Sequence, residues 1–184
     1  MKNPVLEAII NRRSIIRFET SAIEDEKIQA ILEAGQWAPS WLNKQPWSFT
    51  VVKDPTIKES LASFAPTAFT LGIREAPVCI VVSVDPKEDP FHFVEDGATA
   101  TQNMSLAAYS LGLGSCWIGV FNLEKRKGSY EEKIKSLLEI PKDHRVISVL
   151  PVGIPKLSRE KSRKAPSSMI YMNKFGTHTD YTKR

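Results

Sequence analysis

The pattern of hydrophobic and polar positions along this chain predicts several amphipathic helices. Apolar side chains recur every three to four positions, which places them on one face of a helix. This spacing predicts helices over Pro4 to Arg13, Asp25 to Trp37, Val94 to Leu111 and Tyr130 to Ile140, with a shorter helix from Asp54 through Leu61. Ser129 and Glu132 fit a capping box at the start of the last of these helices.

Other segments predict strands, because their apolar residues alternate or run continuously over a few positions. These segments are Trp47 to Val52, Val78 to Val84 and Arg145 to Val152, with a short strand or extended loop at Cys116 to Ile118. The run from Val78 to Val84 is continuous, so this strand is expected to be buried on both faces. Two helices precede the first strand, and this order favours an α+β fold over a regular β-α-β array.

Two segments carry more apolar surface than one small domain readily covers. The predicted helix from Val94 to Leu111 is nearly free of charge after Asp96, so it is expected in the core or at a subunit interface. The tail after Pro166 is also rich in apolar side chains, which need cover from this chain or from a neighbouring one. They are Met169, Ile170, Tyr171, Met172 and Phe175.

The composition is that of one folded domain, residues 1–184. Hydrophobic residues make up 42% of the chain and charged residues 25%, which is too apolar for disorder. Cys79 and Cys116 form no C-x-x-C pair, so no metal site is expected, and buried reduced thiols are favoured over a single disulfide. The chain shows no signal-like segment and no apolar run long enough for a membrane span, so we expect a cytoplasmic protein.

The net charge of +4 does not indicate a nucleic-acid partner, because cations and anions are interleaved along most of the chain. The segment from Lys156 to Lys164 is an exception, with five cations and one anion. It is either a solvated loop or a site for phosphate or another polyanion. Arg12-Arg13-Ser14 presents a similar choice, because guanidinium and hydroxyl groups bind oxyanions but basic residues also complement a helix C-terminus.

The connection from Trp37 to Trp47 contains three tryptophans, two prolines and the carboxamides of Asn43 and Gln45. Prolines stiffen a loop, carboxamides can read the edge of a flat heterocycle, and Trp41 can form the wall of a pocket. Alternatively, the tryptophans anchor the core and the carboxamides cap the turn. The three histidines lie outside these clusters and are expected to be surface or structural residues; they are His92, His144 and His178.

Taken in order, these motifs resemble those of the nitroreductase-like flavoproteins, which bind FMN. Members open with R-R-S-x-[RK]-x-F, which corresponds to Arg12 to Phe18, and continue with A-P-S-x-x-N-x-Q-P-W, which matches Ala38 to Trp47. A segment like G-L-G-x-x-W-I-G follows the long helix, here Gly112 to Gly119, and the pattern ends with Gly153, Pro155, Lys161 and Arg163. The resemblance implies a three-layer α+β fold with a central mixed, mostly antiparallel sheet flanked by helices. It also implies a homodimer in which the C-terminal tail wraps the partner subunit.

The resemblance further implies noncovalent FMN as the cofactor. FAD is disfavoured because the chain lacks a dinucleotide-binding glycine loop. The implied contacts are Arg12, Arg13 and Ser14 at the ribityl and phosphate groups, Pro39, Ser40, Trp41 and Asn43 along the ring from the partner subunit, Ile118 and Gly119 near flavin N5, and Lys161 and Arg163 at the phosphate. No catalytic acid or base is expected, because the flavin itself carries the chemistry.

The activity implied is hydride transfer from NAD(P)H to the flavin, followed by reduction of a small acceptor such as a nitroaromatic or quinone. One residue departs from the family pattern, because Ile16 stands where members place a cation near the flavin edge that gains negative charge on reduction. Arg17 or another cation substitutes for it, or the flavin chemistry is altered. The alternative function is a flavin-binding or flavin-sequestering protein without NAD(P)H turnover. The sequence selects neither the acceptor nor NADH over NADPH.

Overall fold

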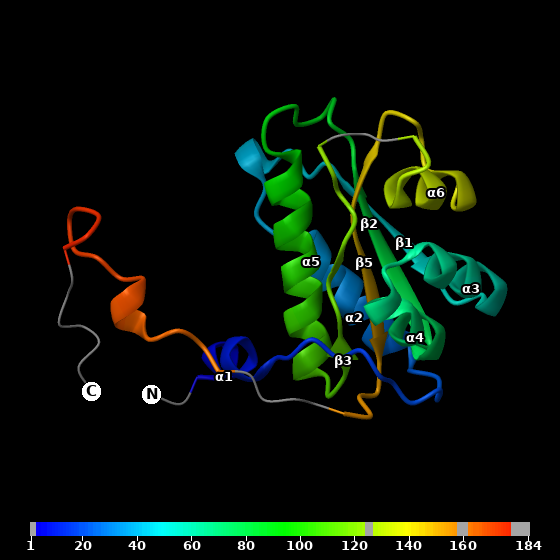
Figure 1. Cartoon of the computed structure of the whole chain (residues 1–184), viewed down its shortest axis with the longest axis horizontal. Helices are drawn as coiled ribbons and strands as arrows, with labels where there is room; N and C mark the ends of the chain where they lie inside the picture. Colours follow the sequence, from blue (N-terminus) through cyan, green and yellow to red (C-terminus); the bar gives the residue numbers. More distant parts are fainter. Residues whose placement is uncertain (1–2, 124–126, 158–161, 178–184) are drawn as a thin grey trace.

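A five-stranded sheet forms the centre of the molecule (Figure 1). The computed structural model describes residues 3–123, 127–157 and 162–177. The strands are β1 (Trp47–Val52), β2 (Val78–Val84), β3 (Gly114–Ser115), β4 (Ile118–Gly119) and β5 (Arg145–Gly153). Their order is β1-β2-β5-β3, with β4 also paired to β5, and every one of these pairings is antiparallel. The expected mostly antiparallel α+β sheet is therefore confirmed.

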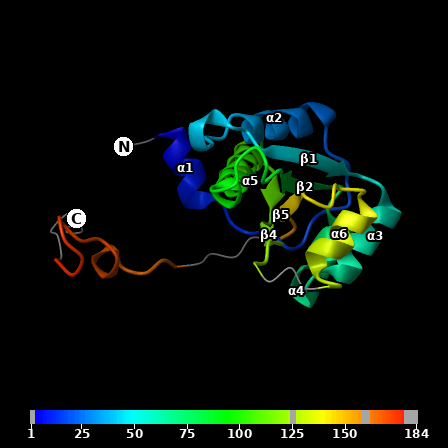
Figure 2. The ribbon, with the colours of Figure 1, turned by 90° about the horizontal axis from the view of Figure 1, so that it is seen from above.

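Helices cover both faces of this sheet, which gives three layers (Figure 2). One face carries α2 (Asp25–Gln36) and α5 (Phe93–Ser110), with α1 (Pro4–Asn11) beside α5. The other face carries α3 (Pro55–Phe64), α4 (Thr67–Glu75) and α6 (Tyr130–Leu137). The apolar pattern does not predict α4, a short helix that contains Gly72.

Successive side chains of the central strands point to opposite faces of the sheet, and this alternation divides the core into two apolar layers. In β2, Ile80 and Val82 pack in the cluster formed with α2 and α5, whereas Cys79 and Val81 pack in the cluster formed with α3, α4 and α6. All seven residues of β2 and all nine of β5 are buried. A continuous apolar run thus produces a strand that is buried on both faces, as predicted.

Small side chains allow α5 to lie close against the sheet. Its buried residues are Asp96, Gly97, Ala100, Thr101, Met104, Ser105 and Ala108. A Cβ atom added at Gly97 would lie 2.5 Å from a side-chain carbon of Ile147, so a larger residue would push the helix away from β5. The prediction that this helix is buried is confirmed for one face, and the burial depends on small residues rather than on a wide apolar surface.

The predicted boundaries of the outer helices need two corrections. The first helix ends at Asn11 rather than Arg13, which leaves the arginines in an extended segment. The last ends at Leu137 rather than Ile140, because Glu139 adopts a left-handed backbone conformation with φ of 56°. At its start, Ser129 caps the Glu132 N–H as predicted, but the Glu132 carboxylate accepts from the Gly128 N–H instead of closing the box on Ser129.

Apolar side chains remain exposed at both ends of the described chain. On α1 these are Val5, Leu6, Ile9 and Ile10. The segment 162–177 lies apart from the layered body in both views and exposes Met169, Ile170 and Phe175 (Figures 1 and 2). Cys79 and Cys116 are buried thiols rather than a disulfide pair, as expected. Within the described ranges, no helix is long and apolar enough to cross a bilayer.

Candidate functional site

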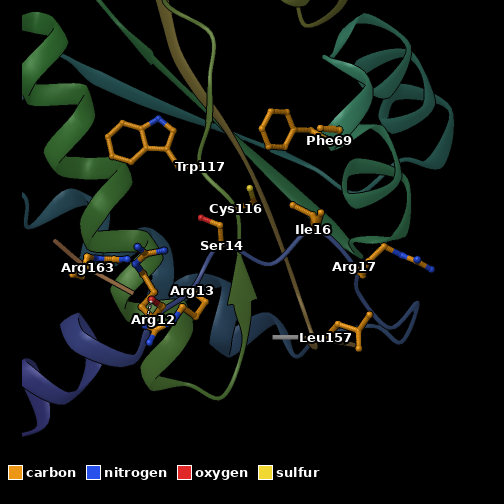
Figure 3. Close-up of a pocket in the computed structure, with 11 residues that line it drawn as sticks. Arg12, Arg13, Ser14, Ile16, Arg17, Phe69, Cys116, Trp117, Leu157 and Arg163 are labelled. Atoms are coloured by element: carbon orange, nitrogen blue, oxygen red, sulfur yellow. Dashed lines mark hydrogen bonds between the residues drawn. The ribbon is translucent and has the colours of Figure 1, made fainter. Parts of the chain in front are cut away.

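A cavity of about 430 Å³ opens between the segment after α1 and the crossing from β3 to β4 (Figure 3). Its walls come from four separate parts of the chain. The lining residues are Arg12, Arg13, Ser14, Ile16 and Arg17, then Ala68 and Phe69 on α4, Cys116 and Trp117 between β3 and β4, and Leu157 and Arg163 after β5. The fold thus gathers Arg12, Arg13, Ser14 and Arg163, which the sequence proposes as phosphate ligands, in one place.

The extended segment after α1 is fixed to the sheet by alternate residues. The Ile15 N–H donates to the Ser115 carbonyl at 2.9 Å, and the side chains of Ile15 and Phe18 are buried in the core. An isolated antiparallel bridge also joins Phe18 to Pro155. Because successive side chains of an extended chain point to opposite sides, Ser14 and Ile16 are exposed on the cavity side.

Three guanidinium groups meet at one end of the cavity. In Figure 3, Arg163 lies beside Arg12 and Arg13. The Arg13 Nη1 donates to the carbonyls of Ile10 and Arg12, but the Nε atoms of Arg12 and Arg13 are buried without a hydrogen-bond partner among the described residues. Burial lowers the pKa of Arg12, and the charges of Arg163 and Arg13 lower it further. A bound anion such as a phosphate dianion would accept hydrogen bonds from these unsatisfied donors. It would also offset the repulsion among the three guanidinium charges.

Arg17 does not supply the cation that Ile16 lacks. Its Nε lies 3.0 Å from both carboxylate oxygens of Glu75, and its Nη2 lies 2.9 Å from one of them. The Glu75 carboxylate also accepts the Phe18 N–H, and the hydrogen bond from Arg17 holds the pKa of Glu75 below its usual range. In Figure 3 the Arg17 guanidinium points away from Ser14 and Cys116. The cavity near Ile16 is therefore bordered by an arginine that is paired with Glu75 and by apolar groups.

Ile118 and Gly119 follow the cavity wall without lining the cavity itself. Ile118 is buried in the core, whereas Gly119 is exposed, and a Cβ added at Gly119 would meet no atom within 4 Å. Both lie on β4, directly after Trp117. Their backbone is thus near the proposed flavin site, and the space in front of Gly119 is open.

The tryptophan-rich connection, Trp37 to Trp47, does not line this cavity. A short 3-10 helix, η1 (Trp41–Asn43), is held at the N-terminal part of α5, where the Trp41 N–H donates to Asp96 at 3.0 Å. The Thr99 hydroxyl donates to the Pro39 carbonyl, and the Ser40 hydroxyl accepts from the Gln45 N–H. The cavity is lined by Cys116 and Trp117, between β3 and β4, and by none of Pro39, Ser40, Trp41 and Asn43. The fold of this chain therefore does not bring these four residues to Arg12 and Ser14.

Two predicted residues fall outside the described ranges, and several cavity residues had no sequence signal. Lys161 and His178 lie outside the part of the chain that the structure describes. Sequence reasoning missed Ala68, Phe69, Leu157 and the wall position of Trp117, because apolar residues on separate elements form no motif. His92 is a structural residue, as expected, since its ring stacks on Trp41 with centroids 5.0 Å apart.

The class of protein that this fold and cavity define is confirmed by comparison with known proteins. A sequence model described as the Nitroreductase family matches residues 9–154, and the chain belongs to this family. An Archaeoglobus fulgidus protein, provisionally named an NADH dehydrogenase/NAD(P)H nitroreductase, is 40% identical over 156 residues, with 82% of this chain and 85% of the relative covered.

Two further relatives have names that include FMN. The FMN reductase (NADPH) of Bacillus subtilis is 28% identical over 97% of this chain and 77% of its own length. The structure of a Desulfovibrio desulfuricans protein, provisionally named a nitroreductase, was solved in complex with FMN. It superimposes with a TM-score of 0.80 at 32% identity, with 95% of this chain and 99% of that chain covered. The three-layer fold is therefore that of the family.

Proposed function

We propose that this protein is an FMN-dependent oxidoreductase that takes a hydride from NAD(P)H and reduces a small acceptor such as a nitroaromatic or quinone. The observation that carries the proposal is the group of three arginines at one end of a cavity whose described lining contains no carboxylate. The buried Nε atoms of Arg12 and Arg13 have no partner among the described residues, so they fit the phosphate of FMN. The FMN-linked names of the relatives support the same cofactor.

When bound, FMN supplies the nitrogen that accepts a hydride and then passes on the electrons. The protein's own contribution is binding, orientation and exclusion of water. Arg12 and Arg163 would hold the phosphate, and the Ser14 hydroxyl would donate to the ribityl or phosphate oxygens. Ile16 and Phe69 would provide apolar walls beside the ring. Ile118 and Gly119 would lie near the flavin nitrogen that takes the hydride, with the N–H of Gly119 directed away from β5.

We further propose that the site is completed by a second copy of the chain in a homodimer. Pro39, Ser40, Trp41 and Asn43 would then line the ring of the partner's flavin. The exposed apolar side chains of α1 and of segment 162–177 support this assembly, since such surfaces are normally covered. An obligate interface of this kind buries more than roughly 2,000 Å².

A second candidate function is a flavin-binding protein without NAD(P)H turnover. It is favoured by one observation: among the described residues, the arginine that follows Ile16 is bound to Glu75 rather than directed at the cavity. A cation at that edge would stabilise the charge that reduction adds. The apolar edge lowers the tendency of the flavin to accept electrons and could halt the reaction at binding.

Anaerobic titration of the FMN-loaded protein with NADH and NADPH separates the two functions. For the oxidoreductase, one or both nucleotides bleach the visible absorbance of the bound flavin, and addition of a quinone restores it. For the binding protein, neither nucleotide bleaches the flavin, although dithionite does. Failure of the purified protein to bind FMN would reject both functions.

A further inference from the structure

Two buried carboxyl groups lie beneath the tryptophan-rich connection, outside the cavity described above. Asp89 precedes α5 and is 0% exposed, and Asp96 lies in the first turn of α5 and is 4% exposed. The Oδ1 atom of Asp89 accepts the N–H groups of Phe91 and His92, each at 3.0 Å. The Oδ1 atom of Asp96 accepts the N–H of Trp41, also at 3.0 Å. Asp96 thus ties η1 (Trp41–Asn43), called the Trp41 segment below, to α5.

The second oxygen of each carboxyl group has no partner among the described residues. The side chains of Asp89 and Asp96 are nevertheless within hydrogen-bond reach of each other. A bond between two carboxyl groups requires a proton on one of them, because two carboxylates offer only acceptors. One shared proton would therefore satisfy both remaining oxygens together and remove one of two adjacent buried negative charges.

Few charged groups surround this pair. His92, from the loop before α5, has its Nδ1 atom 3.8 Å from Asp89 Oδ1, and its ring stacks on Trp41. Glu95 on α5 and Lys44 beside the Trp41 segment are exposed to solvent. The described structure records no arginine or lysine bound to either carboxyl group, and the Nδ1 atom of His92 is itself buried without a hydrogen-bond partner among the described residues. The cluster is therefore neutralised by a proton on one of the carboxyl groups, by a proton on His92, or by both.

The environment identifies which carboxyl group holds the proton. Burial raises the pKa of Asp96; the Trp41 N–H opposes this, and the hydrogen bond and charge of Asp89 raise the pKa further. Burial also acts to raise the pKa of Asp89. The N–H groups of His92 and Phe91, the hydrogen bond from Asp96 and the charge of His92 together outweigh it and leave that pKa below its usual value. The two groups therefore have opposite tendencies, as in other carboxyl pairs that share one proton.

We propose that Asp89 and Asp96 share one proton, with Asp96 as the acid, and that this pair positions the Trp41 segment for its place against the partner's flavin. The role in flavin binding rests on the proposed function, whereas the shared proton does not. Asp96 is a positioning residue, since it acts through the Trp41 backbone. When the shared proton is lost at higher pH, Asp96 becomes a buried carboxylate beside Asp89, and release of the Trp41 segment lets water reach that charge.

Carbon-13 NMR of the aspartate side chains in the FMN-free protein tests the shared proton. In the wild type, Asp96 should titrate above the range of an ordinary aspartate. Asp89→Asn keeps an oxygen that can cap the Phe91 and His92 N–H groups but removes the negative charge, so the pKa of Asp96 should fall. Independent titration of both groups in the ordinary range, or no response of Asp96 to Asp89→Asn, would overturn the proposal.

FMN affinity as a function of pH tests the positioning role. Asp96→Asn keeps an acceptor for the Trp41 N–H and places a permanent N–H donor toward Asp89, so it imitates the protonated acid. The wild-type dissociation constant should rise as the pH passes the raised pKa of Asp96. Asp96→Asn should remain tight and independent of pH, while Asp96→Ala should bind weakly throughout.

The outcomes distinguish this inference from the proposed function. If the NMR titrations are linked but FMN affinity does not depend on pH in the wild type, the positioning role is wrong. If Asp96→Asn retains the wild-type pH profile, Asp96 is not the group responsible, and the proposal fails. If FMN does not bind to any form at any pH, the proposed function fails while the NMR result still decides the shared proton.

Discussion

Replacement of Arg12 by glutamine should have opposite effects on FMN affinity and on the stability of the FMN-free protein. Arg12 is partly buried beside Arg13 and Arg163, and burial and these charges lower its pKa. A base whose pKa falls on folding is held in its charged form at a cost to the folded state. Removal of its charge should therefore stabilise the empty protein, whereas FMN should bind less tightly because its phosphate loses a charged donor.

The expected loss of affinity follows from the strength of a charge-assisted hydrogen bond. Such a bond contributes roughly 1.5–3 kcal/mol, which corresponds to about 10–100-fold in the dissociation constant. At FMN equal to 100 times the wild-type dissociation constant, ligand binding adds about 2.7 kcal/mol to the free energy of unfolding. A variant with 100-fold weaker binding gains only about 0.4 kcal/mol at the same FMN concentration, by the same relation.

Calorimetric titration with FMN and chemical denaturation with and without FMN measure both effects. Arg74→Gln is the matched control, because it removes the same charge from an exposed arginine that binds Glu59 and does not line the cavity. The control should leave FMN affinity unchanged. The reasoning is refuted if Arg12→Gln binds FMN as tightly as the wild type, or if it destabilises the FMN-free protein relative to the wild type.

Three further perturbations test other parts of the account. Ile16→Lys should raise the midpoint potential of the bound flavin in a redox titration, because a cation there favours the charge gained on reduction; an equal potential would mean that another cation already acts. Glu75 has a pKa lowered by its hydrogen bond from Arg17, so its stabilising contribution is present above the ordinary glutamate range and is lost as the pH falls. Denaturation at a series of pH values should show that the free energy of unfolding of Glu75→Gln falls less in the acid range than that of the wild type. An equal fall in both proteins would contradict the stabilising role of the Glu75 carboxylate. Truncation after Pro166 should dissociate the dimer and release FMN together, as followed by light scattering at low micromolar concentration; a folded, FMN-loaded wild-type monomer would argue against the dimer.

The central strands could be predicted from the sequence because their alternating or continuous apolar residues match the way that the folded sheet buries them. The ranges Trp47–Val52 and Val78–Val84 match the structure, and the third long strand differs by one residue. Helix ends were harder to place, since the left-handed conformation of Glu139 is not one that its residue type favours. The helix Thr67–Glu75 was missed because it is short and contains a glycine.

The polar part of the candidate site was also accessible from the sequence, whereas its apolar walls were not. Arg12 and Arg163 are far apart in the chain, but each stands in a motif for which the family resemblance proposes a phosphate contact. Phe69 and Leu157 line the same cavity, yet each resembles any other apolar residue until the chain is folded. The engagement of Arg17 by Glu75 was equally hidden, because it joins residues 58 positions apart without a shared motif.

The most direct test of the central claim is a crystal structure of the protein with FMN. The account predicts that the FMN phosphate lies within hydrogen-bond distance of Arg12 and Arg163 of one subunit. It also predicts that Trp41 of a second subunit lies along the same flavin ring. A phosphate bound away from these arginines, or a ring enclosed by one chain alone, would contradict the proposed site.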